Sequence, residues 1–215
     1  MRVILFVNGE FDTEDAEVAS EQIRPDDLVI TVDGGTRHAW ASGVTPHVVI
    51  GDLDSLSSEE VARLRAAHTR VISFSPDKDE TDLELALRYS VEQGATEIVV
   101  WGALGGRLDQ TMANVLLLTL PELGGVDVRI VARAGKETAF LVREAATITG
   151  QPGDTVSLIP LGGNAVGVTT DGLKWELHHE DLHFGPARGV SNVLKQASAR
   201  VRLQRGMLLC VVIHV

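Results

Sequence analysis

The chain changes its secondary-structure pattern once, near residue 121, and this change limits the folds it can adopt. Up to about residue 120, short β-branched runs alternate with helix-like stretches, and the runs at 2–7, 28–32 and 46–50 end in turn-forming residues. Such alternation is typical of βαβ units around a mostly parallel sheet with helices on both faces. We therefore predict an α/β fold, with a mostly parallel sheet and flanking helices, for the N-terminal part.

The rest of the chain has an all-β pattern. Short apolar runs separated by Gly, Pro and Asp turns lie at residues 128–132, 138–142, 155–159, 165–168, 201–203 and 208–215. This spacing predicts a smaller all-β domain, either a sandwich or barrel-like. Because the first of these runs still fits the first sheet, we expect one domain at residues 1–133 and the other at residues 134–215.

Composition excludes several classes of protein. At 215 residues and 44% apolar, the chain can bury a core without disulfides or structural metals. Its single cysteine, Cys210, is predicted to be a buried thiol. A formal net charge of −11 with scattered Lys and Arg argues against nucleic-acid binding. No apolar run is long enough to cross a bilayer, so we expect no membrane partner and a cytoplasmic location.

Three acidic clusters, at residues 51–55, 77–82 and 106–110, each lie where a predicted strand gives way to a predicted helix. In an open α/β sheet, ligands bind outside the carboxyl ends of the strands. Carboxylates gathered there indicate a metal and phosphate site. The pattern favours a Mg-dependent phosphoryl-group transferase.

In the first cluster, Asp52 and Asp54 are two residues apart after an apolar strand. If the chain stays extended there, both side chains project from the same face and offer two hard oxygen ligands to Mg²⁺. An Asp-rich turn, in which Asp54 or Ser55 caps the next helix, explains the same residues equally well.

In the second cluster, Thr81 and Glu84 have capping-box spacing, which predicts a helix that begins at Asp82. Acids in a first helical turn complement the helix dipole, but this leaves Asp77 and Asp79 unexplained. Four acids within these six residues repel one another unless a cation lies among them. We therefore favour a functional role for this cluster.

In the third cluster, glycines precede Arg107, and an apolar helix at residues 112–120 follows it. Backbone N–H groups and a guanidinium at such a helix start suit a phosphate. The alternative is a surface pair between Arg107 and Asp109, which contributes little to stability. The apolar residues of this helix lie along one face: Leu108, Met112 and Leu116.

Two further motifs carry less information. Asp33-Gly34-Gly35 follows a strand and is only loosely similar to a nucleotide-binding turn, because it lacks the spaced glycines of the dinucleotide fingerprint. A simple helix-opening turn explains it as well. His178, His179 and His183 show no zinc-ligand pattern, so we expect a solvated loop there.

Together and in this order, the motifs at 33–35, 51–55, 77–82 and 106–110 resemble those of the thiamine pyrophosphokinase family, and residues 170–177 and 189–192 are similar to its thiamine-side motifs. The resemblance implies a thiamine diphosphokinase, which transfers diphosphate from ATP to the thiamine hydroxyl and releases AMP. It also implies that residues 1–133 bind nucleotide and metal, and that residues 134–215 bind thiamine and dimerise. The family works as a homodimer with shared active sites.

The resemblance also implies roles for individual residues. The expected Mg²⁺ ligands are Asp52, Asp54 and Asp82, with Asp79 as an outer or further ligand. Arg107 and Lys78 would neutralise charge as AMP leaves, and Asp109 would position the substrate or accept its proton. The residues expected on the nucleotide are Asp33, Gly34, Lys78, Thr81, Arg107 and Gln110. Those expected on thiamine are Trp175, Ser191 and Asn192.

Trp175 would offer the cationic thiamine an aromatic face. Without the resemblance, a tryptophan in the core of the β domain explains this residue equally well. Asp171 stands where the family often has Thr, which leaves any hydroxyl contact at this position open.

Three other functions compete with this one. A diphosphokinase of the same architecture could act on a hydroxymethyl-pterin, since the acidic clusters serve the donor whichever alcohol accepts. A non-catalytic sensor of nucleotide or thiamine diphosphate would not need the acidic residues that the chain retains. An Asp-x-Asp glycosyltransferase would leave the second and third clusters without a role.

Overall fold

Strands and helices alternate through the first 135 residues, as expected. The protein is described by a computed structural model at residues 1–74 and 78–215, so Asp77 of the second acidic cluster lies outside the described residues. The chain divides into two compact units, Met1–Gly135 and Lys136–Val215. The expected boundary was at residue 133.

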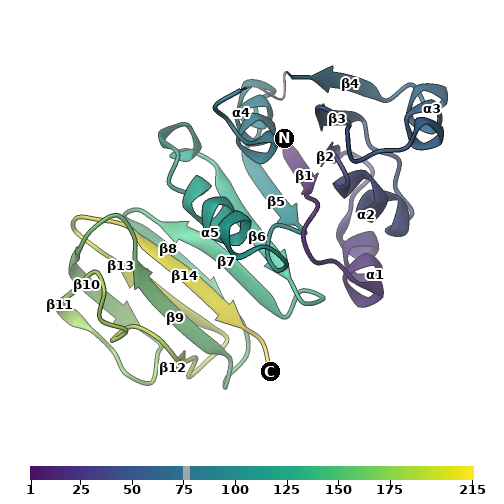
Figure 1. Cartoon of the computed structure of the whole chain (residues 1–215). Helices are drawn as coiled ribbons and strands as arrows, with labels where there is room; N and C mark the ends of the chain where they lie inside the picture. The colour runs from purple at the N-terminus through teal and green to yellow at the C-terminus, as the bar shows by residue number, and fades with distance from the viewer. Residues whose placement is uncertain (75–77) are drawn as a thin grey trace. The chain divides into compact units, whose positions relative to one another are not determined.

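The described strands of the first unit form a parallel sheet in the order β6-β5-β1-β2-β3-β4 (Figure 1). Its elements are β1 (Arg2–Phe6), α1 (Thr13–Gln22), β2 (Leu28–Val32), α2 (Gly35–Ala41), β3 (Val48–Gly51), α3 (Ser58–Ala66), β4 (Arg70–Ser73), α4 (Asp82–Glu92), β5 (Glu97–Trp101), α5 (Leu108–Leu117), a 3₁₀ turn (Pro121–Leu123) and β6 (Asp127–Ala132). From β1 the order runs one way to β2, β3 and β4 and the other way to β5 and β6. The topological switch point therefore lies between β1 and β5.

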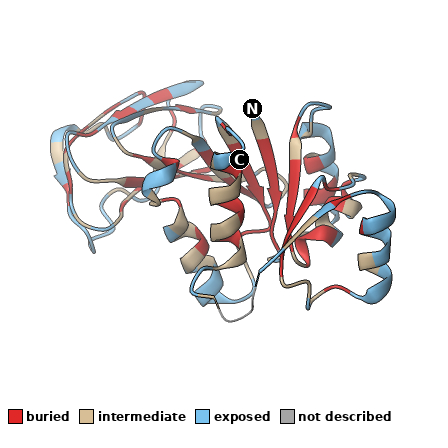
Figure 2. Ribbon diagram, turned by 90° about the horizontal axis from the view of Figure 1, so that it is seen from above, coloured by how far each residue is buried: buried red, intermediate tan, exposed pale blue. Residues whose placement is uncertain are grey.

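Alternate residues of the central strands bury their side chains on opposite faces of this sheet. Ile4, Phe6 and Trp101 pack on one face with Ala19 of α1 and Ala39 of α2. Helix α4 contacts β2 and β3. Figure 2 shows the strands of this unit as mainly buried and the outer helix faces as exposed. Burial on both faces explains why these strands read as continuous apolar runs.

The predicted start of α4 is confirmed, and α3 begins with a similar cap at Ser57, not at Asp54 or Ser55. Ser57 caps α3, where its side chain accepts from the Glu60 N–H and the Glu60 side chain accepts from the Ser57 N–H. Thr81 caps α4 and accepts the N–H of Glu84, so the helix begins at Asp82. These caps form between residues three apart, which is why sequence alone could predict them.

The second unit is an antiparallel β-sandwich, which confirms the all-β prediction and selects the sandwich over the barrel. Its strands are β7 (Glu137–Val142), β8 (Ala145–Thr149), β9 (Thr155–Pro160), β10 (Ala165–Asp171), β11 (His178–Leu182), β12 (Asn192–Val193), β13 (Ser198–Arg202) and β14 (Leu208–Ile213). One layer has the order β12-β9-β14-β7 and the other β11-β10-β13-β8. The expected loop at His178 and His179 is wrong, because both residues lie exposed on the edge strand β11.

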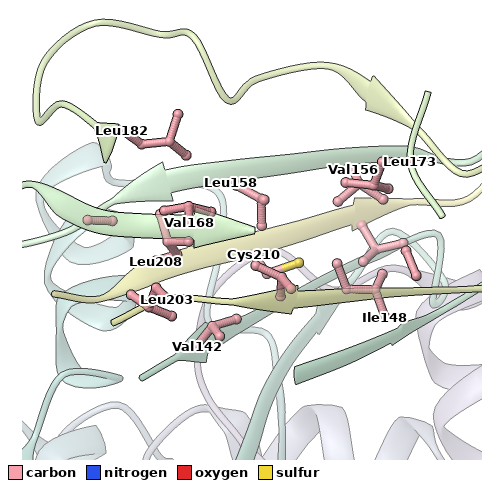
Figure 3. Close-up of a cluster of buried hydrophobic side chains, with 14 of the residues drawn as sticks. Val142, Ile148, Val156, Leu158, Val168, Leu173, Leu182, Leu203, Leu208 and Cys210 are labelled. Atoms are coloured by element: carbon pink, nitrogen blue, oxygen red, sulfur yellow. The ribbon is translucent and has the colours of Figure 1, made fainter. Parts of the chain in front are cut away.

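Apolar side chains from both layers form the core of the sandwich (Figure 3). Val156, Leu208 and Cys210 come from one layer, and Val168 and Val201 from the other. The Cys210 thiol is fully buried there, as predicted. A buried thiol among aliphatic side chains behaves as a small apolar group.

The apolar face of α5 is not covered within the described chain. Leu108, Met112 and Leu116 are 75%, 53% and 48% exposed. Residues four apart on a helix lie one above the other, so the three side chains form a continuous stripe. No helix within residues 1–74 and 78–215 is long and apolar enough to cross a membrane.

Candidate active site

A cavity of about 630 Å³ lies at the carboxyl ends of the strands in the first unit. Its walls come from the segments that follow β1, β2, β3 and β5 and from the starts of α4 and α5. They include Asn8, Gly9, Glu10, Asp33, Asp54, Ser55, Thr81, Asp82, Gly105, Gly106, Arg107, Gln110 and Asn114. The cavity therefore lies at the switch point, where open α/β sheets bind their ligands.

Asp33, directly after β2, belongs to the carboxylate group of this cavity. Its backbone is left-handed, with φ at 43°, and its Oδ1 accepts the N–H of Leu53 at 3.1 Å. Burial raises the pKa of Asp33 to about 7, against the lowering effect of the Leu53 N–H, and the carboxylates of Asp82 and Asp52 raise it further. The sequence placed Asp33 on the nucleotide, whereas the structure groups it with the acidic residues.

Asp52 and Asp54 lie in a turn, so the structure selects the turn over the extended chain, the two conformations that the sequence left open. Leu53 between them has φ at 63°, and the N–H of Asp54 donates to Asp52 Oδ1 at 3.0 Å. The two carboxylates still lie close together. Repulsion from Asp52 raises the pKa of Asp54, with smaller contributions from burial and from Asp82.

Asp82 opens α4 and forms an ion pair with Lys78. Both side chains are largely buried, at 15% exposed for Lys78 and 25% for Asp82. The Lys78 ammonium also lies 5.4 Å from the ring centroid of Phe74. Any cation or phosphate that binds here must share or displace this pair, since one carboxylate and one ammonium now satisfy each other.

Among the described residues, no three His, Cys, Asp or Glu side chains are arranged as a ready metal site. The pKa values of Asp33 and Asp54 nevertheless respond to Asp52 and Asp82, so the four carboxylates share one electrostatic environment. Mg²⁺ needs only one or two protein carboxylates beside phosphate and water, so a preformed site with three ligands is not required. Carboxylate oxygens are hard ligands, so this group of four aspartates fits Mg²⁺.

Arg107 forms a two-point ion pair with Asp109. The distances are 2.5 Å from Nη2 to Oδ2 and 3.1 Å from Nε to Oδ1, and the side chains are 72% and 66% exposed. The pair lowers the pKa of Asp109 and raises that of Arg107. This is the surface pair that the sequence left as the alternative. An exposed pair is weak, so the guanidinium, which lines the cavity, can exchange it for a phosphate.

Residues that sequence reasoning missed shape the loop before α5. Glu10 Oε1 accepts the N–H of Gly106 at 2.9 Å. Asn114, which is buried, donates from Nδ2 to the carbonyl of Ala103 at 2.8 Å. The Asn8-Gly9 turn after β1 was the available signal, because the end of the first strand adjoins the switch point.

The remaining predicted nucleotide-side residues differ in their placement. Thr81 and Gln110 line the cavity, whereas Asp79 and Asp109 are exposed and do not line it. Gly34 is the N-cap of α2, and a Cβ at Gly34 would lie 2.4 Å from Asn8 Oδ1. Glycine at this position therefore lets the two turns approach each other.

A second cavity, of about 430 Å³, lies within the β unit. It brings together the predicted residues Trp175, Ser191 and Asn192, with Arg188 on the same wall. Trp175 is 56% exposed, so the alternative of a tryptophan in the core is wrong. Ser191 has a left-handed φ of 62°, and its N–H donates to Ser157 Oγ at 3.1 Å.

Two family models match the chain. Residues 6–130 match the model described as thiamin pyrophosphokinase, catalytic domain. Residues 145–208 match the model described as thiamin pyrophosphokinase, vitamin B1 binding domain. Each match falls within one of the two units.

Individual relatives agree with these matches. The chain is 27% identical to thiamine pyrophosphokinase of Bacillus subtilis (strain 168) over 184 residues, 86% of each chain. It is 31% identical to thiamine pyrophosphokinase 1 of Arabidopsis thaliana over 175 residues, which cover 76% of this chain and 64% of the plant protein.

Solved structures show the same fold. The crystal structure of thiamine pyrophosphokinase from Bacillus subtilis superposes with a TM-score of 0.87 at 23% identity, over 100% of this chain and 99% of the other. That of thiamin pyrophosphokinase from Geobacillus thermodenitrificans gives 0.84 at 27% identity, over 99% and 97%.

Proposed function

The chain belongs to the thiamine pyrophosphokinase family, and we propose that the cavity of its first unit binds ATP while that of its second unit binds thiamine. It is a thiamine pyrophosphokinase, with a kinase domain and a thiamine-binding domain. One observation carries the assignment of the nucleotide site. Residues of all three acidic clusters, Asp54, Asp82 and Arg107, line a single cavity at the switch point of the sheet.

In the proposed reaction, the thiamine hydroxyl oxygen forms a bond to the β-phosphorus of ATP. The bond between that phosphorus and the oxygen bridging to the α-phosphate breaks, and AMP leaves with its electron pair. Thiamine thereby gains an intact diphosphate, and its hydroxyl proton is released. Negative charge increases on the departing AMP, so cationic side chains near the bridging oxygen accelerate the step.

We assign Mg²⁺ to Asp52, Asp54 and Asp82, and add Asp33 to their group. Support comes from the raised pKa of Asp33, which reflects burial and the other carboxylates. When bound, Mg²⁺ would neutralise phosphate charge and orient the donor. Asp79 keeps its proposed role as an outer ligand, although it is exposed in the structure.

Arg107 and Lys78 are the proposed cationic groups. Each is paired with a carboxylate that ATP would have to replace as its partner, Asp109 for Arg107 and Asp82 for Lys78. Asp109 then either positions the thiamine hydroxyl or accepts its proton.

The remaining donor contacts follow from the walls of the cavity. The Gly105 and Gly106 backbone leads into the N-terminus of α5, which suits a phosphate. Thr81 and Gln110 line the same space. Ser55 Oγ is buried without a hydrogen-bond partner among the described atoms, so it can contribute a contact to the nucleotide.

We further propose a homodimer, in which one active site takes its nucleotide half from one chain and its thiamine half from the other. The two sets of residues lie in different units, each with its own cavity. The exposed stripe of Leu108, Met112 and Leu116 on α5 gives a second copy an apolar surface to cover.

The direct test is to incubate the purified protein with ATP and Mg²⁺, adding thiamine or a hydroxymethyl-pterin in separate reactions. We expect AMP, and not ADP, to form only with thiamine, and its amount to match thiamine diphosphate. AMP formation with the pterin alone would assign the acceptor to the competing diphosphokinase. Release of ADP would contradict transfer of an intact diphosphate.

A further inference from the structure

The side-chain amide of Asn192 makes two hydrogen bonds with the backbone of Trp175. Its Oδ1 accepts the Trp175 N–H at 3.1 Å, and its Nδ2 donates to the Trp175 carbonyl at 2.7 Å. Oδ1 also accepts the N–H of Val193 at 2.9 Å. Both lone pairs of the amide oxygen are therefore used, and one N–H of the amide remains for any other partner.

These bonds extend a short strand-like pairing between two segments. The N–H of Lys195 donates to Gly172 O at 3.0 Å, and the N–H of Lys174 donates to Val193 O at 2.9 Å. At Trp175, which follows Lys174, the partner is the side-chain amide of Asn192 in place of a backbone peptide group. The Asn192 backbone is paired instead with Val156 of β9. Asn192 therefore ties the Trp175 segment to β9.

The indole of Trp175 has little packing to hold it in place. It is 56% exposed, and Lys174 Nζ lies 4.7 Å from its ring centroid. The direction of an exposed side chain depends on the backbone that carries it. Both backbone polar groups of Trp175 are bonded to Asn192, so this asparagine holds the backbone from which the indole projects at the cavity.

We propose that Asn192 is a positioning residue, which acts on thiamine through Trp175 and not by touching the substrate itself. The inference rests on the proposed function only in that thiamine stacks on Trp175. It changes the role expected from the sequence, where Asn192 was a direct substrate contact. A neutral amide suits this position, since it accepts from the N–H with its oxygen and donates to the carbonyl with its nitrogen, whereas a carboxylate can only accept.

The test is a double-mutant cycle between Asn192 and Trp175, read as separate KM values for thiamine and ATP. Asn192→Ala should raise the KM for thiamine about tenfold, the effect of losing two hydrogen bonds of ordinary net strength. The KM for ATP and kcat should change little. Asn192→Asp, which has the same shape, should also raise the KM for thiamine, because a carboxylate would face the Trp175 carbonyl.

In a Trp175→Ala background, neither change at Asn192 should raise the KM for thiamine further. A further increase would show a direct contact and overturn the proposal, as would an unchanged KM in both single Asn192 variants. If Trp175→Ala alone leaves the KM unchanged, the thiamine site itself is misassigned, which is a separate failure. The matched control is Asn164→Ala. Asn164 Oδ1 accepts the N–H of Phe184 outside the cavity, so the loss of this bond should leave both KM values unchanged.

Discussion

Arg107 and Asp109, two residues apart at the start of α5, form a two-point ion pair whose side chains are mostly exposed. The pair holds the Arg107 guanidinium at the edge of an acidic cavity, and the interaction is weak enough to be exchanged for another. Exposed ion pairs contribute little to stability, so little stability is lost when the guanidinium binds another anion instead. The two interpretations of residues 106–110 are therefore compatible. Arg107 can pair with Asp109 in the absence of nucleotide and contact a phosphate when nucleotide binds.

The first prediction concerns the shape of this cation. Arg107→Lys keeps the charge but loses the planar fork, so we expect kcat/KM for ATP to fall by about tenfold or more. The melting temperature should not change, because the pair is exposed. Steady-state kinetics and a thermal melt measure the two effects. The matched control is Arg129→Lys, whose pair with Asp127 is also two residues apart; equal activity of the two variants would remove Arg107 from the phosphate site.

The second prediction concerns the carboxylate group. Asp54→Asn should abolish Mg-dependent turnover, while stability stays the same or rises slightly because repulsion from Asp52 is relieved. Activity is measured over a Mg²⁺ titration, with circular dichroism to confirm the fold. Asp26→Asn, an exposed aspartate of the same unit, is the control. Normal turnover of the Asp54 variant at saturating Mg²⁺ would contradict its role as a ligand.

The third prediction concerns acid stability of the β unit. Asp154 is buried and accepts hydrogen bonds from His214 Nδ1 at 2.6 Å, the Gln151 N–H at 2.8 Å and the Val215 N–H at 3.2 Å. Burial alone would raise its pKa, but the bonds from Gln151, His214 and Val215 outweigh burial and lower it below the ordinary 3.8. The stabilisation is therefore complete above pH 3.8 and is lost as the pH falls through the lower pKa of the folded state.

Asp154→Asn places an amide against these N–H donors and should lower the free energy of unfolding by about 1–3 kcal/mol at neutral pH. Urea unfolding between pH 7 and the acid limit should show the difference from the parent shrink as the parent carboxylate becomes protonated. Asp181→Asn makes the same change at an exposed carboxylate, which accepts the Gly167 N–H, and should have a small effect. Equal losses in the two variants would argue against a special role for the buried carboxylate.

The fourth prediction concerns the proposed shared site. Asp54→Asn and Trp175→Ala place their lesions in different units. At a thiamine concentration far below the raised KM of the Trp175 variant, each variant alone should show little or no turnover. A mixed dimer would contain one intact site and one doubly damaged site if sites are shared. Mixing and refolding the two variants should then restore part of the activity. Light scattering that gives a monomer mass, or no rescue in verified mixed dimers, would refute the shared site and leave the chemistry unaffected.

Sequence alone determined those features that depend on near neighbours. Apolar runs followed by turn residues predicted most strands of both units, because burial imposes its pattern along each strand. The Thr81 and Ser57 caps were predictable because capping bonds join residues three apart. The ordered motifs led to the family, and to a cavity that contains Asp54, Asp82 and Arg107.

Features that depend on contacts between distant residues became visible only in the folded protein. Asp33 accepts the N–H of Leu53, 20 residues away, in the turn between Asp52 and Asp54. Glu10 holds the N–H of Gly106, 96 residues away, and Asn192 holds Trp175 across 17 residues. Each of these bonds forms only after the sheets bring separate segments together. A residue's type records which hydrogen bonds it can make, whereas its partner depends on where the folded backbone places the other group.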